Sequence, residues 1–113
     1  MTWKKLSDSA PLLKRGTLFR TPAQSPFEDW VDFMLMDDWQ SPSSFSLWVC
    51  SGRQAGNPLV RIPREATDPT SNAVQKSWLI ENWQQWVYAD AKPEQVYVHP
   101  PYSIESNWKE KEF

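Results

Sequence analysis

SWLIENWQQWVY, residues 77–88, carries three of the eight tryptophans in this chain of 113 residues. At 100° per residue, five apolar side chains fall within an arc of about 120°: Leu79, Ile80, Trp83, Trp86 and Val87. The pattern predicts an amphipathic helix that Ser77 caps and that stops near the end of the stretch. Trp83 and Trp86 should therefore be buried, whereas Trp78 projects from the polar side and is a candidate for an exposed contact.

Ten prolines and three glycines divide the rest of the chain into short elements. Alternating apolar residues, bounded by turn residues, predict four strands at residues 16–21, 45–52, 59–62 and 95–99. RQAGNP supplies a hairpin turn between the second and third of these strands. The polar stretch EATDPTSNA, residues 65–73, is expected to be a loop.

Residues 28–38, EDWVDFMLMDD, fit two secondary structures. A helix would bring Trp30 and Phe33 onto one stripe, whereas a strand would place Val31, Phe33 and Leu35 on one face. The short, bounded apolar run and the hairpin-like loop after it favour the strand. The helix stays open as the alternative.

These elements predict a single α+β domain over residues 1–113. Its expected architecture is a small curled antiparallel sheet of about five strands, packed against one main C-terminal helix. A chain of this length suits one domain with one core. The polar tail, residues 103–113, is expected to fray.

Charge and composition exclude several functional classes. Twelve Lys and Arg against fourteen Asp and Glu give a net charge of −2, which disfavours nucleic acid as the main partner. No segment approaches the roughly 20 apolar residues of a membrane span, and the first residues lack the apolar core of a signal peptide. We therefore expect a cytoplasmic protein that needs no membrane. The single cysteine, Cys50, cannot form an internal disulfide.

The sequence offers no recognisable catalytic or metal-binding motif. His99 is the only histidine and stands beside two prolines, and one Cys with one His cannot make a structural zinc site. The three glycines are isolated and form no phosphate-binding loop. We expect no catalytic residue, no metal and no cofactor, and a small hydrolase is the least favoured class.

An acidic run is the strongest candidate for a binding surface. Residues 28–38 contain five carboxylates and no base, and a tryptophan follows them directly. An aromatic ring beside carboxylates suits contact with a basic protein surface, because it combines apolar area with charge steering. The predicted partner-binding residues are Glu28, Asp29, Asp32, Asp37, Asp38 and Trp39, with Trp78 as a secondary candidate. The alternative is a solvated acidic face with Trp39 folded back over the sheet.

The order of the motifs resembles the immunity protein 45 family of bacterial polymorphic toxin systems. The resemblance runs over residues 2–98 through MTWKKL, LLKRGTLFRTP, VDFMLMDD, LWVCSGRQAGNPLVRIPRE, SWLIENWQQWVY and EQVYV. Its most specific parts are residues 51–56 and residues 78–87.

This resemblance implies a non-catalytic protein that binds and neutralises a cognate protein toxin delivered between bacterial cells. The acidic run would then meet a basic surface of a toxin that acts in the cytoplasm. The competing class is an aromatic-rich binding module for glycan, peptide or single-stranded nucleic acid. The sequence predicts neither the activity of the toxin nor the oligomeric state.

Overall fold

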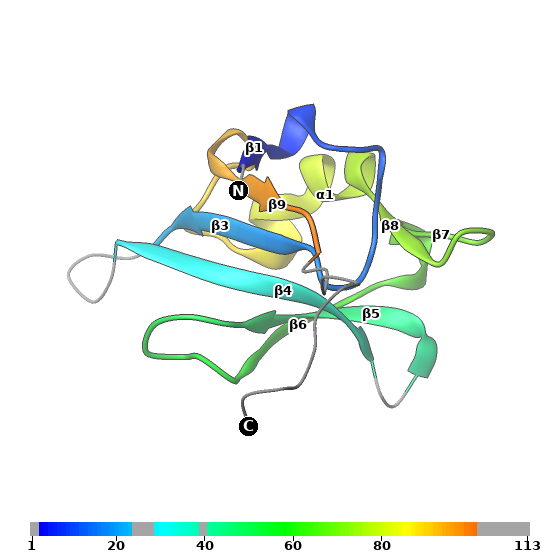
Figure 1. The fold of residues 1–113 in the computed structure, drawn as a ribbon, viewed down its shortest axis with the longest axis horizontal. Coiled ribbons are helices and arrows are strands. Elements are labelled where there is room, and N and C mark those ends of the chain that lie inside the picture. Colours follow the sequence, from blue (N-terminus) through cyan, green and yellow to red (C-terminus); the bar gives the residue numbers. More distant parts are fainter. Residues whose placement is uncertain (1–2, 24–28, 39–40, 102–113) are drawn as a thin grey trace, which may run out of the picture.

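The computed structural model describes residues 3–23, 29–38 and 41–101, and the predicted fraying of residues 103–113 lies outside these ranges. The described chain folds into two antiparallel sheets and a set of helical segments (Figure 1). The main sheet has six strands in the order β1 (Lys4–Lys5), β9 (Tyr97–His99), β3 (Leu18–Pro22), β4 (Trp30–Asp38), β5 (Ser41–Val49) and β6 (Pro58–Ile62). The predicted α+β class is confirmed.

Strand β4 settles the ambiguity of residues 28–38 in favour of the strand. It pairs with β3 on one side and β5 on the other, and Val31, Phe33 and Leu35 are all buried on one face. The other four predicted strands also form, with bounds displaced by a few residues. The predicted hairpin forms between β5 and β6 and buries Phe45 and Leu47.

A second, smaller sheet was missed by the sequence interpretation. It has three strands in the order β2 (Leu12–Leu13), β8 (Ala73–Gln75) and β7 (Thr67–Asp68). The prediction of a loop over residues 65–73 is therefore wrong. The Asp68 carboxylate accepts hydrogen bonds from the backbone N–H groups of Thr70 and Ser71, at 3.3 and 2.9 Å. This side-chain turn reverses the chain and lets β7 pair with β8.

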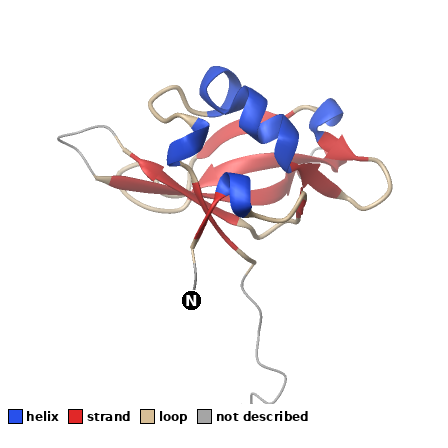
Figure 2. Ribbon diagram, turned by 90° about the horizontal axis from the view of Figure 1, so that it is seen from above, coloured by secondary structure: helices blue, strands red, loops and turns tan. Residues whose placement is uncertain are grey.

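The helical segments gather on one side of the main sheet (Figure 2). They are η1 (Leu6–Asp8), η2 (Arg64–Ala66), α1 (Lys76–Asn82), the π-helical η3 (Trp83–Val87) and η4 (Pro93–Gln95). The principal helix begins at Lys76, so the prediction of Ser77 as its cap is wrong. Tertiary contacts hold the helix start instead, because the Lys76 ammonium donates to the carbonyls of Ser7 and Ser9.

The second half of this helix has a different pitch from the first. The N–H of Tyr88 donates to the carbonyl of Trp83 at 2.9 Å, which is the i to i+5 bond of a π turn. A π turn advances by a smaller angle per residue than the 100° used in the projection. The predicted burial of Trp86 is therefore wrong: its side chain is 47% exposed, whereas Trp83 is 0% exposed.

Trp86 and Trp78 form a pair at the edge of the main sheet. The Trp86 indole N–H donates to the carbonyl of Arg61, on edge strand β6, at 3.2 Å. Trp78 is half-buried, packs against the core and meets Trp86 edge to face, with ring centroids 5.9 Å apart. Trp86 thus covers part of β6, an edge strand that could otherwise associate with another strand.

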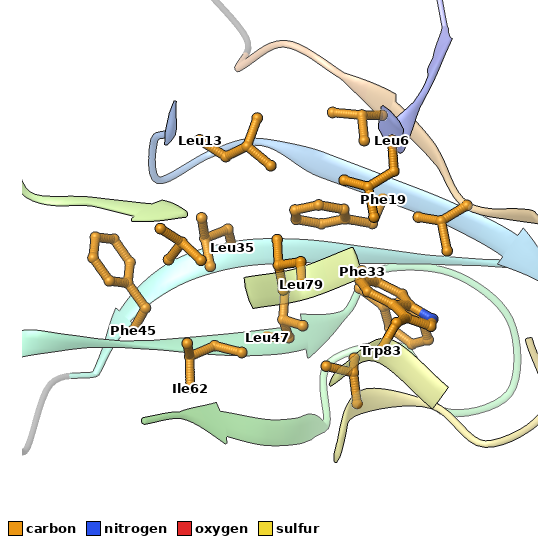
Figure 3. Packing of buried hydrophobic residues seen from close by; sticks show 14 of the residues in the cluster. Leu6, Leu13, Phe19, Phe33, Leu35, Phe45, Leu47, Ile62, Leu79 and Trp83 are labelled. Atoms are coloured by element: carbon orange, nitrogen blue, oxygen red, sulfur yellow. The ribbon is translucent and has the colours of Figure 1, made fainter. Parts of the chain in front are cut away.

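The core lies between the main sheet and the helical segments, and Trp83 packs beside Phe33 toward one end of the residues drawn (Figure 3). The Trp83 ring centroid is 5.6 Å from that of Phe19 on β3 and 6.5 Å from that of Phe33 on β4. Leu79, one turn earlier, is also fully buried. These side chains bind the helix to one face of the sheet, at its central strands.

Candidate functional site: the outer face of the main sheet

The outer face, as we call it, is the face of the main sheet that points away from α1 and η3. Along β4 the buried residues alternate with Trp30, Asp32, Met34 and Met36, which therefore lie on the outer face. Cross-strand pairing adds Arg20 opposite Asp32 and Trp48 opposite Met34. None of the described helices covers this face (Figure 2).

A bidentate ion pair between Arg20 and Asp32 lies near the middle of the outer face. Arg20 Nε is 2.8 Å from Asp32 Oδ1, and Arg20 Nη2 is 2.9 Å from Asp32 Oδ2. The Arg20 guanidinium also stacks 4.3 Å from the centroid of the Trp3 ring, which in turn lies 5.2 Å from the His99 ring. The hydrogen bond to Asp32 raises the pKa of Arg20, so the guanidinium stays charged at any physiological pH.

Two further arginines neutralise the carboxylates at the end of β4. Arg15 Nη1 is 2.7 Å from Asp37 Oδ2, and Arg61 Nε is 3.0 Å from Asp38 Oδ2. Asp38 is only 5% exposed and follows a register shift between Asp37 and Asp38. Arginines that are distant in the sequence thus neutralise these two acidic residues.

The predicted binding residues are therefore only partly brought together as an acidic surface. Asp32, Asp37 and Asp38 each have an arginine partner, and Asp29 is exposed without an ion pair among the described residues. Glu28 and Trp39 lie outside the described residues. Trp78 belongs to the helical side, where it contacts Trp86, and so does not join the outer face.

Two apolar residues of the outer face were missed by the sequence interpretation. Among the described residues the exposed large hydrophobic side chains are Trp30 at 53%, Trp86 at 47% and Met36 at 40%. Trp30 and Met36 both belong to the outer face, with half-buried Met34 and Trp48 between them. The signal was present in the sequence, because a strand that buries Val31 and Phe33 must turn Trp30 and Met36 to the opposite side.

One thiol borders the Arg20–Asp32 pair. The N–H of Cys50 donates to the carbonyl of Asp32 at 2.7 Å, and the N–H of Asp32 donates to Ser51 Oγ at 2.9 Å. Partial burial, and then the negative charge of Asp32, raise the pKa of the Cys50 thiol. Cys50 is thus a poor nucleophile at neutral pH, since the thiolate is the reactive form.

The cavities contain no assembled catalytic group among the described residues. A cavity of about 650 Å³ between β2 and β9 is mainly apolar, with Lys4, Lys14 and His99 among its lining residues. A smaller one of about 370 Å³ on the outer face is lined by Asp38, Trp48 and neighbouring residues of β6. Within the described ranges no group of three or more His, Cys, Asp and Glu residues is placed to hold a metal ion. No helix in those ranges is both long and apolar enough for a membrane crossing.

A comparison with protein families identifies the class of this domain. The family model that matches describes immunity proteins, and the match covers residues 6–98, most of the chain. The chain belongs to the family described as Immunity protein 45. This confirms the resemblance seen in the sequence motifs. No curated protein and no solved structure matches the chain.

Proposed function

We propose that this chain is a non-catalytic immunity protein that binds and neutralises a cognate bacterial toxin delivered between cells, and that it acts in the cytoplasm. The observation that carries the proposal is the match to the immunity protein family over residues 6–98. A protein of this class protects by association, so it needs a surface complementary to the toxin. It needs neither a catalytic centre nor a cofactor.

The outer face is the surface that best suits this role. On the opposite side, the sheet is occupied by the core around Trp83 and Leu79. The proposed toxin-binding face comprises the outer side of β4 and the residues that flank this strand in the sequence, including Glu28, Asp29, Asp32, Asp37, Asp38 and Trp39. The paired carboxylates and arginines would supply the polar contacts, and Asp29 an exposed negative charge.

Co-production with the toxin tests the proposal. The chain and the toxin encoded beside its gene are induced together in a bacterial host, with the toxin retained in the cytoplasm in one strain and exported in a second. We expect growth to recover only in the first strain, and the two purified proteins to elute as one complex. Undiminished toxicity with the chain in excess, and separate elution, would contradict the proposal. Saturable binding to a glycan array without a toxin complex would favour the aromatic binding module.

A further inference from the structure

The charges of the outer face are largely satisfied within the chain itself. Arg20 with Asp32 and Arg61 with Asp38 are opposite-charge pairs on this face, and Arg15 with Asp37 is a third pair at the end of β4; each has a net charge of zero. A basic toxin residue would have to displace one of these arginines to reach one of these three carboxylates. Such an exchange replaces one ion pair with another, so it adds little to the free energy of binding.

The apolar residues of the same face have no such partners to lose. Trp30, Met34 and Met36 lie on the outer side of β4; Met34 is four residues after Trp30, and Met36 is two residues after Met34. Trp48 lies opposite Met34 on β5. At about 3.3 Å per residue this stripe runs for about 20 Å from Trp30 to Met36. Asp32 and its partner Arg20 interrupt the row between Trp30 and Met34. Single exposed apolar residues are normal on soluble proteins, but several of them gathered on a face that none of the described helices covers mark an interaction site.

We infer that this apolar stripe, made of Trp30, Met34, Met36 and Trp48, is the centre of the toxin-binding interface. The inference rests on the proposed function. The toxin surface that covers the stripe is correspondingly apolar, not basic. The Arg20–Asp32 pair lies within the contact, between Trp30 and Met34, and the Arg61–Asp38 pair lies at its end; both set its register. Tryptophan and methionine are enriched in the fully buried centres of interfaces, and tryptophan above all carries a large share of the binding energy.

This chemistry differs from the charge-steered contact expected from the acidic run alone. Attraction between exposed charges falls steeply as salt screens it, with a Debye length near 10 Å at 0.1 M. Burial of an apolar stripe carries no such dependence on salt. The salt dependence of toxin affinity therefore separates the two kinds of interface.

The test is a titration of the purified cognate toxin against the chain and its variants at about 50 mM and about 500 mM NaCl, a range that shortens the Debye length several-fold. We expect the dissociation constant of the unmodified chain to change less than about 10-fold between these salts. The paired change Trp30→Ala and Met36→Ala should weaken binding at least 30-fold, roughly the effect of one interface hot spot. Trp86→Ala is the matched control, because its ring is similarly exposed but lies on the helical side. It should leave the dissociation constant unchanged.

The outcomes separate this inference from the proposed function. If the unmodified chain does not bind the toxin at either salt, the proposed function fails and the inference fails with it. Suppose instead that the chain binds, but that the Trp30 and Met36 changes have no effect while Asp29→Lys or high salt abolishes the complex. The toxin surface is then basic, and only the inference is overturned. Thermal unfolding of each variant verifies that the exposed substitutions leave the fold intact.

Discussion

Replacing Trp83 with alanine is expected to lower the free energy of unfolding by about 3–5 kcal/mol. The ring is fully buried between Phe19 and Phe33, and it links the π-helical segment to the two central strands β3 and β4. Urea unfolding followed by far-ultraviolet circular dichroism measures the loss. Trp83→Phe should lose less, because the indole N–H has no hydrogen-bond partner among the described residues and its removal leaves no polar group behind.

Trp86→Ala is the control for this prediction. The Trp86 ring is half-exposed, and its main polar contact is the hydrogen bond to the Arg61 carbonyl. A net loss of about 1 kcal/mol is expected from that bond. Equal losses at positions 83 and 86 would contradict the π-helical turn, because a uniform α-helix would bury both rings.

Replacing Asp38 with lysine is expected to lower the free energy of unfolding by about 3 kcal/mol. The substitution places an ammonium group in a site that is 5% exposed, beside the Arg61 guanidinium that Asp38 now neutralises. The loss lies at the lower end for a broken buried pair, since Arg61 is mostly exposed and turns to solvent easily. The same urea titration measures it.

Asp29→Lys is the matched control for Asp38→Lys. Asp29 is exposed and has no ion pair among the described residues, so its reversal should change stability by no more than about 0.5 kcal/mol. A stable Asp38→Lys protein would show that the carboxylate is not needed in its buried position. The contrast also matters for binding studies: charge reversal at position 38 perturbs the fold, whereas reversal at position 29 reports on the surface alone.

The elements that follow simple periodicity were predictable from the sequence. The alternation in β4 placed Val31, Phe33 and Leu35 on one face, which is the buried one, and the alternation at residues 45–52 predicted a strand without deciding which of its faces is buried. The helix was predictable as far as Asn82, because its first turns keep α-helical pitch. The direction in which the Trp86 side chain points was not predictable, since the change to a π turn at Trp83 depends on packing against the sheet.

The candidate site was less predictable than the fold. The sequence shows five carboxylates in residues 28–38 without a base among them, so the run appears uniformly acidic. Arg15, Arg20 and Arg61 neutralise three of them, and all three arginines come from other parts of the chain. Such pairing depends on sheet order and register, which one sequence does not specify. The small sheet of β2, β8 and β7 was also missed, because strands of two or three residues carry too little periodicity.

Hydroxyl-radical footprinting of the toxin complex tests most directly whether the outer face is the binding surface. In the free chain, the exposed side chains of Trp30, Met36 and Trp86 should all be oxidised. In the complex we expect Trp30 and Met36 to be protected several-fold, while Trp86 on the helical side is oxidised as in the free protein. Protection of Trp86, with Trp30 and Met36 still oxidised at their free rates, would contradict binding through the outer face.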